Sequence, residues 1–311
     1  MTGASSGVGR ASAILLASRG ANVVLVARSP ESLADAERDC HHAEPAARTL
    51  VVPADVTDAA AVDAVFEQAA EQFGRVDAVV HSAAALAYGR FEDVPAEVFD
   101  AAIDTTLGGT VNTARAALHH FRDHGGGTLV VVGSLLGKIA TPFMSSYVTA
   151  KWAVHGLVRT LQIEARSEPG IEVSLVSPGG VNTPVYRQAG TYLGWHGRPP
   201  PPVDSPEKVA RAVVAAVERP RRETSVGLGN PVAVLGFRLL PDVYDLLVTP
   251  LMRLGGISRD AAPATPGNVL DPQPAGDAVH GPWDRQWLRP LGAGTAAAAT
   301  GLAWLSQRSR R

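Results

Sequence analysis

The chain has 311 residues, of which 46% are hydrophobic and 19% charged, and its formal net charge is -2 at pH 7. This composition provides material for a substantial core and excludes an intrinsically disordered chain. The near-neutral charge argues against a general nucleic-acid binder, because such proteins carry an excess of basic residues.

The cysteine content and the apolar stretches predict a location for the protein. Cys40 is the single cysteine, so no disulfide can form within the chain. The N-terminal residues lack the basic and apolar regions of a signal peptide. The two longest apolar stretches, Val243–Leu251 and Ala296–Leu305, are shorter than the ~20 residues of a transmembrane helix. We therefore expect a cytoplasmic protein without a transmembrane segment.

Short β-branched runs alternate with longer helical patterns over the first two-thirds of the chain. This alternation is typical of βαβ units, and it predicts an α/β protein in which a Rossmann-like, doubly wound parallel sheet lies between two layers of helices. Strands are expected at Asn22–Ala27, Thr49–Val52, Ala78–His81, Thr128–Gly133, Glu172–Ser177 and Ser225–Leu228. Helices are expected at Gly9–Ser18, Ala59–Gln72, Pro95–Phe121, Ser145–Ser167 and Pro206–Glu218.

A glycine-rich segment, Thr2–Gly9, opens the chain and is followed by a helical pattern and a strand. Glycines permit a tight turn and let backbone N–H groups approach a pyrophosphate, which the N-terminus of the following helix attracts through its partial positive charge. We therefore expect a dinucleotide at this loop. The residues expected to contact it are Gly3, Ser5, Ser6, Gly7, Val8 and Gly9.

The strand that normally precedes such a loop is missing, because only Met1 stands before it. A vacant central position would leave backbone groups of the neighbouring strands unpaired, at a cost of about 1–3 kcal/mol for each buried group. Two explanations compete: a start placed too late, so that the natural protein has a longer N-terminus, or a truncated and unstable chain. We favour the first.

The end of the second expected strand indicates which dinucleotide is bound. Folds that prefer NAD usually place a carboxylate there to accept from the ribose 2′-hydroxyl, whereas this chain has Arg28. A guanidinium can clamp a 2′-phosphate through charge-assisted hydrogen bonds, so Arg28 predicts NADP(H). Asp55 and Val56, after the next strand, are expected beside the adenine. Asp55 is alternatively the cap of the helix that begins near Ala59.

Three polar residues predict a catalytic group. Tyr147 and Lys151 lie one helical turn apart, and a nearby ammonium favours the phenolate form of a tyrosine, which brings its pKa toward the working range of a general acid/base. Ser134 follows an expected strand at the carboxyl edge of the sheet, where open α/β folds bind ligands. Its hydroxyl can hold a substrate oxygen.

These motifs together resemble the classical short-chain dehydrogenase/reductase family over roughly Thr2 to Gly229. The loop is similar to the family's Thr-Gly-x-x-x-Gly-x-Gly, and Ser134, Tyr147 and Lys151 match its catalytic residues at the usual spacing. The resemblance implies that Tyr147 is the general acid/base, that Lys151 lowers its pKa and holds the nicotinamide ribose, and that Ser134 polarises the carbonyl. It implies further cofactor contacts from the Pro-Gly segment at Pro178, Gly179, Val181 and Thr183, and dimers or tetramers built through the long helices.

The chain departs from the family pattern at two places. The family's Asn-Asn-Ala-Gly appears as His81-Ser82-Ala83-Ala84, where Ser82 and Ala83 are still expected to adjoin the cofactor. The family's catalytic Asn aligns with Thr106, which lacks an amide. We expect His81 to be a strand-end histidine with local hydrogen bonds rather than a substitute acid/base.

The substrate is predicted only as a small carbonyl compound or alcohol. The segment Tyr186–Val203 is expected to form a mobile lid in which Tyr192 and Trp195 favour a hydrophobic substrate. Residues 1–229 are expected to form the NADP-binding catalytic domain, and residues 230–311 an appendage with short helices in Leu235–Leu254 and an irregular tail in Ala261–Trp287. The apolar helices pack on the sheet or a partner subunit, or alternatively serve a membrane surface or a lipid-like substrate.

Two functions of different classes follow from these motifs. The first is an active NADP(H)-dependent oxidoreductase, without a metal, that transfers a hydride between the nicotinamide and a carbonyl or alcohol. The alternative is a catalytically silent nucleotide-binding or interaction protein on the same scaffold. The complete set of Ser134, Tyr147 and Lys151 favours the enzyme, because a silent scaffold has no chemical need for all three.

Overall fold

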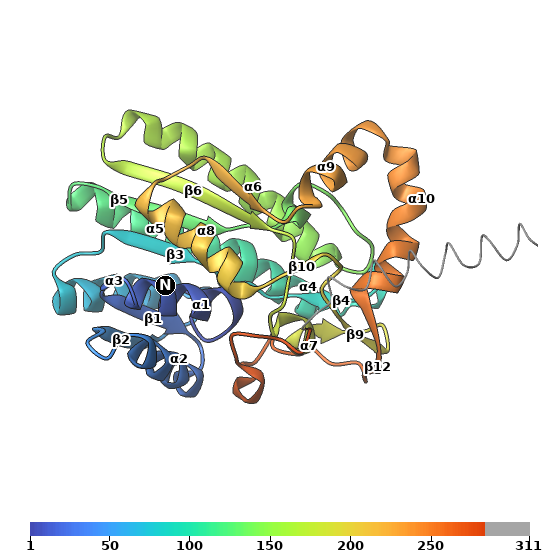
Figure 1. Ribbon diagram of the computed structural model, residues 1–311, viewed down its shortest axis with the longest axis horizontal. Helices are drawn as coiled ribbons and strands as arrows, with labels where there is room; N and C mark the ends of the chain where they lie inside the picture. The colour runs from blue at the N-terminus through green and yellow to red at the C-terminus, as the bar shows by residue number, and fades with distance from the viewer. Residues whose placement is uncertain (284–311) are drawn as a thin grey trace, which may run out of the picture.

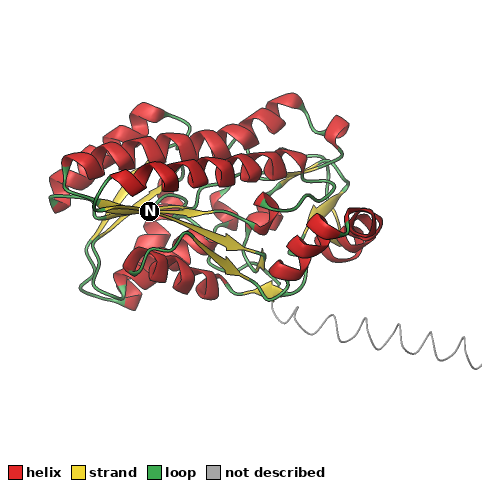
Figure 2. Ribbon diagram, turned by 90° about the horizontal axis from the view of Figure 1, so that it is seen from above, coloured by secondary structure: helices red, strands yellow, loops and turns green. Residues whose placement is uncertain are grey.

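A parallel β-sheet lies between two layers of helices in the computed structural model, which describes residues 1–283 (Figures 1 and 2). β1 pairs with β2, and β3, β5, β6 and β11 pair side by side in that order, all in parallel. The strands are β1 (Val23–Ala27), β2 (Thr49–Pro53), β3 (Ala78–His81), β5 (Gly127–Val132), β6 (Ile171–Pro178) and β11 (Glu223–Val226). The predicted fold class and the six predicted strands are confirmed, with ends that differ by one or two residues.

The first two residues lie in the central position of the sheet, between β1 and β3. Thr2 forms parallel bridges to Val26 on one side and to His81 on the other. Its N–H donates to the carbonyl of Val80 at 3.0 Å, and the carbonyl of Met1 accepts from the N–H of Val26 at 2.9 Å. These bonds join the two groups of strands at the carboxyl edge, where the glycine-rich loop begins.

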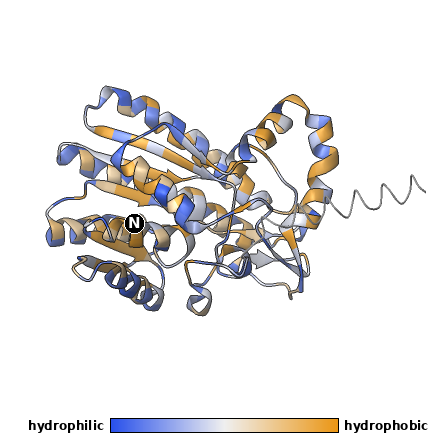
Figure 3. Ribbon diagram, viewed as in Figure 1, coloured by the Kyte–Doolittle hydropathy of each residue, from blue (hydrophilic) through white to orange (hydrophobic). Residues whose placement is uncertain are grey.

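Apolar helix faces cover the two sides of the sheet, as is typical of parallel sheets, and bury most of the central strands β5 and β6. Helices α1, α2 and α8 cover one side, and α3, α5 and α6 cover the other. Figure 3 shows the apolar strands between these two layers. The helices are α1 (Gly7–Ala17), α2 (Pro30–Ala43), α3 (Ala59–Phe73), α4 (Ala96–Ile103), α5 (Gly109–Asp123), α6 (Ser145–Glu164) and α8 (Pro206–Glu218).

The helix expected at Pro95–Phe121 contains a break. A π-helical segment, η2 (Asp104–Gly108), separates α4 from α5 without ending the helical path. Such segments usually mark functional or strained positions. Here the break turns Thr106 inward, so that its hydroxyl accepts from the N–H of Ala85 and donates to the carbonyl of the same residue, at 3.1 and 3.2 Å.

The segment after β6 is built from short elements, most of which are paired strands. They are β7 (Gly180–Val181), α7 (Val185–Gln188), β8 (Gly190–Thr191), β9 (Trp195–Gly197) and β10 (Val203–Asp204). The short strand β4 (Ala87–Tyr88) lies earlier in the chain, after β3. β8 pairs with β4, β10 with β7, and β9 with β12 (Ile257–Ala261). The predicted lid at Tyr186–Val203 is therefore held by partners at both ends rather than standing free over the site.

Two short helices follow β11 and form a hairpin that projects from the sheet (Figure 1). They are α9 (Asn230–Leu239) and α10 (Pro241–Leu251), and a π-helical turn, η5 (Met252–Gly256), continues α10. Residues 262–283 then cross the carboxyl edge of the sheet in a largely irregular path. We call residues 230–254 the apolar hairpin and residues 262–283 the strap.

No helix among residues 1–283 is long and apolar enough to span a membrane. The apolar stretch Ala296–Leu305 and the last residues of the predicted irregular tail lie outside the described residues.

Candidate active site

A cavity of about 860 Å³ runs along the carboxyl edge of the sheet, from Arg28 and Asp55 at one end, past Tyr147, to the apolar hairpin at the other. This is the edge at which open α/β sheets bind their ligands. Most residues that the sequence predicted for the site line this one cavity. They are Gly3, Ser5, Ser6, Gly7, Val8, Arg28, Asp55, Val56, Ser82, Ala83, Ser134, Tyr147, Lys151, Pro178, Gly179, Val181 and Thr183.

Gly9 and Thr106 are predicted site residues that do not line the cavity. A side chain at Gly9 would place its Cβ 1.9 Å from the carbonyl oxygen of Gly3, so Gly9 shapes the loop from behind. Thr106 is completely buried, and both hydrogen-bonding capacities of its hydroxyl are used by the backbone of Ala85. Its neighbour Thr105 faces the cavity instead. Alignment with the family suggested a catalytic role for Thr106, whereas in the structure its hydroxyl holds the backbone of Ala85.

The glycine-rich loop forms a cradle that side chains would fill. Gly3 and Gly7 have positive φ angles of 67° and 53°, which favour glycine. A Cβ on Gly3 would lie 2.8 Å from the backbone nitrogen of Ala83, so the loop and the segment after β3 touch backbone to backbone. The N-terminus of α1 faces the cavity beside this loop, an arrangement that fits a pyrophosphate, and in this structure the Gly7 N–H donates to the carbonyl of Ala278 at 2.8 Å.

Asp55 and Arg28 lie at the end of the cavity formed by β1 and β2. Asp55 accepts from the backbone N–H and the hydroxyl of Thr57, at 2.9 and 2.8 Å. The cap of α3 is Asp58, so the alternative role considered for Asp55 is wrong. The Arg28 guanidinium donates to three consecutive carbonyls of the strap, those of residues 268–270, at 2.5 to 3.3 Å.

Ser134, Tyr147 and Lys151 converge midway along the cavity. Ser134 follows β5 and hydrogen-bonds Tyr147, which lies in the first turn of α6. The Lys151 ammonium lies 5.6 Å from the centre of the Tyr147 ring and donates to the carbonyl of Val132 at 2.9 Å. The β5 strand end and one helical face thus bring the three side chains together.

Burial sets the charge of this group. It raises the pKa of Tyr147 to about 12, against a smaller lowering from the Ser134 hydrogen bond, and it lowers the pKa of Lys151 to about 8. Burial and the Ser134 hydrogen bond thus govern the pKa of Tyr147, and the lowering expected from Lys151 stays a prediction. Tyr147 is a protonated phenol at neutral pH, and a protonated phenol can donate to a substrate oxygen.

His155 is a site residue that the sequence prediction missed. Its Nε2 accepts from the backbone N–H of Ser134 at 3.4 Å, and burial lowers its pKa to about 4, which keeps it neutral at physiological pH. A Cβ on Gly137 would lie 2.3 Å from the imidazole, so the segment after Ser134 depends on glycine there. His155 follows Tyr147 and Lys151 at four-residue intervals on one helix face, a periodicity that could have revealed it.

His81 carries the local hydrogen bond that the sequence suggested. Its Nδ1 lies 2.9 Å from the Thr2 hydroxyl, while its buried Nε2 has no hydrogen-bond partner among residues 1–283. Burial, followed by the charge of Lys151, lowers its pKa to about 3. His81 is therefore a neutral strand-end residue that supports the glycine-rich loop.

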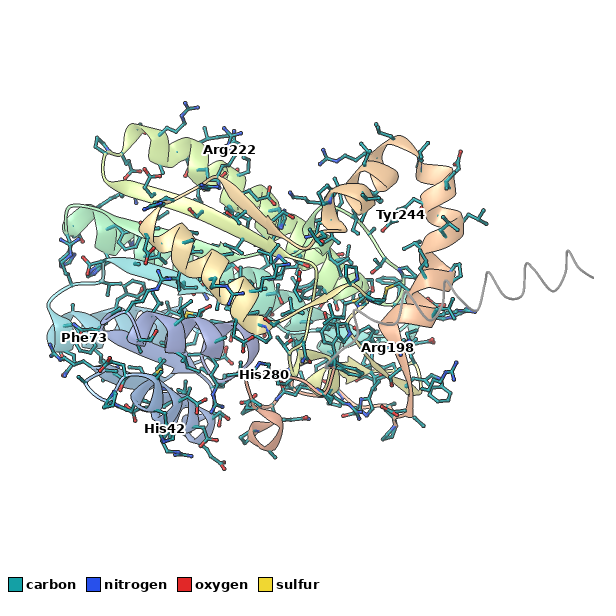
Figure 4. The ribbon with its side chains drawn as sticks, viewed as in Figure 1. His42, Phe73, Arg198, Arg222, Tyr244 and His280 are labelled. Carbon is teal, nitrogen blue, oxygen red and sulfur yellow. The ribbon has the colours of Figure 1, made fainter. Side chains whose placement is uncertain are left out.

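The aromatic residues predicted to face a substrate lie elsewhere. Tyr192 packs against the cluster around Val94 and Val98, and Trp195 is exposed; neither lines the cavity. Tyr186 and Tyr244 line it instead. The Tyr244 hydroxyl donates to the carbonyl of Ala140 at 2.7 Å and so ties α10 to the loop that precedes α6 (Figure 4).

Comparison with known proteins agrees with this geometry. The family described as short chain dehydrogenase matches residues 1–192. An uncharacterized oxidoreductase of Bacillus subtilis (strain 168), YxnA, is 35% identical over 258 residues, which cover 81% of this chain and 71% of that protein.

Two solved structures show the range of cofactors among similar folds. The alcohol dehydrogenase of the archaeon Thermococcus sibiricus, complexed with 5-hydroxy-NADP, is 30% identical with a TM-score of 0.62, covering 73% of this chain and 94% of its own. A short chain dehydrogenase from Mycobacterium paratuberculosis bound to NAD is 26% identical with a TM-score of 0.64, covering 74% and 96%. Nicotinamide dinucleotides thus bind to both neighbours, in different forms.

Proposed function

We propose that this chain, which belongs to the short chain dehydrogenase family, transfers a hydride between NADP(H) and a carbonyl or alcohol substrate, with Tyr147 as the general acid/base. The observation that carries the proposal is the convergence of Ser134, Tyr147 and Lys151 in one cavity with the glycine-rich loop. Family membership supports an oxidoreductase, and the choice of NADP(H) rests on Arg28.

The residues fit the dinucleotide in two respects. The loop glycines leave room for a close approach to the N-terminus of α1, and Arg28 supplies a cation where a carboxylate would repel a 2′-phosphate. The segment with Pro178, Gly179, Val181 and Thr183 would hold the nicotinamide end beside Tyr147. NADP(H), when bound, supplies or accepts the hydride.

In the proposed reaction, side chains of this protein bind the substrate oxygen and transfer the proton to it. In the reductive direction Ser134 and Tyr147 donate hydrogen bonds to the substrate oxygen, and the C=O π bond opens as the carbon gains a hydride and the oxygen takes the Tyr147 proton. The Lys151 ammonium, 5.6 Å from the ring centre, stabilises the phenolate that remains. His155 keeps the Ser134 backbone in place through its hydrogen bond.

The test is turnover by the purified full-length chain. NADPH absorbance is followed with a panel of aldehydes and ketones, and with the corresponding alcohols and NADP⁺ in reverse. We expect at least one carbonyl to be reduced with NADPH preferred over NADH. Cofactor binding without turnover on any member of a broad panel would favour the silent nucleotide-binding protein.

The proposal also covers the location and the oligomeric state of the protein. We propose a cytoplasmic homodimer or homotetramer built through the long helices, where the exposed side chains of Trp152 and Ile163 on α6 offer apolar surface for a partner subunit. We expect analytical ultracentrifugation to give a mass two or four times that of one chain, whereas the mass of a single chain would contradict this part of the proposal.

A further inference from the structure

The apolar hairpin forms one wall of the same cavity that holds Tyr147. Several of its side chains line the cavity and are at the same time exposed to water, which leaves an open apolar mouth. They are Val232, Leu240, Val243, Leu247, Leu251 and Leu254. Large exposed apolar surfaces of this kind commonly mark a binding site. In Figure 3 the hairpin carries apolar residues along much of its length.

The charged residues of the cavity lie away from this wall or are committed elsewhere. Within the described residues, those that line it are Arg28, Asp55, Lys151, Arg198 and Asp277. Arg28 and Asp55 lie at the opposite end, Lys151 belongs to the catalytic group, and Asp277 belongs to the strap. The Arg198 guanidinium donates to the carbonyls of Leu254 and Gly255 (Figure 4).

We propose that the substrate is an uncharged carbonyl compound or alcohol whose long apolar body lies against the apolar hairpin, an inference that rests on the proposed function. A carboxylate or phosphate on that body would lose its hydration beside leucine and valine side chains, and Arg198, the cation next to this wall among the described lining residues, already donates to the carbonyls of Leu254 and Gly255. An apolar chain binds favourably there, because it removes apolar side chains of the wall from contact with water. Each buried methylene stabilises binding by about fourfold.

Substrate length and the charge of its far end test this proposal. For a series of straight-chain 2-ketones, kcat/KM with NADPH should rise by about threefold to fourfold per methylene until the wall is covered. Keto acids of matching length, with the carboxylate at the far end, should be poorer by tenfold or more. A flat series, or a preference for the keto acids, refutes the apolar site.

Two adjacent leucines provide a matched pair of variants. Leu247 lines the cavity and is 48% exposed, whereas Leu246 is 74% exposed and does not line it. Leu247→Asp should lower kcat/KM for the longest ketones at least tenfold and flatten the length dependence, while Leu246→Asp should leave both unchanged. Equal effects of the two substitutions contradict the assignment of this wall.

A binding readout separates this inference from the proposed function. Nile red should fluoresce when bound in the wild-type mouth and be displaced by alkanols with a midpoint that falls as the chain lengthens, whether or not any substrate turns over. If ketones are reduced but the probe and length series show no apolar site, only the substrate class is wrong. If the probe binds but no carbonyl is reduced, only the oxidoreductase assignment is wrong.

The strap carries a second, independent inference. Its Ala278 carbonyl accepts from the N–H of Gly7, the first residue of α1, at 2.8 Å, and its carbonyls at residues 268–270 accept from both terminal nitrogens of the Arg28 guanidinium. These donors are two that the phosphates of NADP(H) need in the proposed site. Asp277, held by the Gln188 amide at 2.8 Å, adds a carboxylate to the cavity wall nearby.

We also infer that the strap is an internal competitor of the dinucleotide, which must displace residues 268–278 to bind. The strap is anchored at its far end, where the N–H of Trp283 donates to the Asn182 side chain at 3.0 Å and the indole packs 5.6 Å from the Arg187 guanidinium. When a site is open in only a fraction of the molecules, the apparent dissociation constant of its ligand is the intrinsic constant divided by that fraction. The strap thus lowers the affinity for the cofactor.

Hydrogen exchange of the full chain with and without NADPH tests the direction of this coupling. Displacement predicts that the amides of residues 268–278 exchange at least tenfold faster with NADPH bound. Slower exchange would mean that the strap closes over the cofactor, which overturns the competition. This measurement needs no variant.

A variant pair measures the strap's effect on affinity. Trp283→Ala should tighten NADPH binding about tenfold, because it loosens the anchor. His280→Ala removes only a pair with Glu207 in which both side chains are about half exposed, and it should leave the affinity within about twofold. Binding that is unchanged in Trp283→Ala refutes the strap alone, whereas no dinucleotide binding by any of the three proteins refutes the proposed cofactor as well.

Discussion

The edge of the sheet and the C-terminal region contribute different things to one cavity. The sheet edge supplies the glycine-rich loop and the group around Tyr147, each fixed by strand ends and helix starts with buried hydrogen bonds. The C-terminal region supplies an apolar wall that is partly exposed and a strap that occupies donors of the loop. The proposed catalytic group and the proposed apolar substrate wall thus lie on separate parts of the chain, which predicts that substitutions can alter one without the other.

The largest expected effect tests whether the chemistry belongs to the sheet edge alone. Tyr147→Phe removes the proton donor and should lower kcat by about a thousandfold, within the range of general acid catalysis, with NADPH affinity changed by only a few-fold. Stopped-flow turnover and fluorescence titration measure the two quantities. Activity above a tenth of wild type would remove Tyr147 from the mechanism.

The next effect sharpens the distinction between the two ends of the cavity. Arg28→Ala should weaken NADPH binding by about 10- to 100-fold, since charge-assisted hydrogen bonds to a phosphate are lost, and should leave NADH binding nearly unchanged. Titration of nicotinamide fluorescence measures both constants. An equal loss for the two cofactors would show that Arg28 does not recognise the 2′-phosphate, whereas tighter binding of both would show that Arg28 acts by holding the strap in the site.

Acid sensitivity should arise in the sheet edge and not in the strap. The pKa values of His81 and His155 are lowered to about 3 and about 4, below the ordinary 6.5, so both stabilise the fold fully above pH 6.5 and lose that contribution as the pH falls. At pH 5 each costs on the order of 2 kcal/mol in unfolding free energy. His81→Asn should remove about half of the loss between pH 7 and pH 5 in denaturant titrations. An unaltered loss would place the acid sensitivity elsewhere.

The last predicted effect is on the rate of carbonyl reduction at alkaline pH. Burial lowers the pKa of Lys151 to about 8, so the ammonium that stabilises the Tyr147 phenolate is lost as the pH rises through that value. The rate of carbonyl reduction at saturating substrate should fall by about tenfold per pH unit above 8. A rate that stays constant to pH 10 would separate the charge of Lys151 from catalysis.

The sheet edge was largely predictable because local spacing determines it. The four-residue step from Tyr147 to Lys151 specifies a shared helix face, and a serine after a strand specifies the carboxyl edge. Contacts between distant segments were not predictable: no local pattern near Arg28 or Gly7 indicates that residues 268–278 lie against them. Thr106 shows the same limit, because a π-helical break changes which residue of a helix points into the cavity.

The hydrogen bond from Tyr244 to Ala140 gives the apolar hairpin a fixed hinge point beside the helix that carries Tyr147. The leucines around it contribute bulk and can be exchanged for other apolar residues to reshape the wall, so a change of preferred substrate requires no movement of the catalytic helix. Replacement of this phenol by phenylalanine would remove one tie, while the contact of Phe237 with Trp152 and the bonds of Arg198 to Leu254 and Gly255 still hold the hairpin.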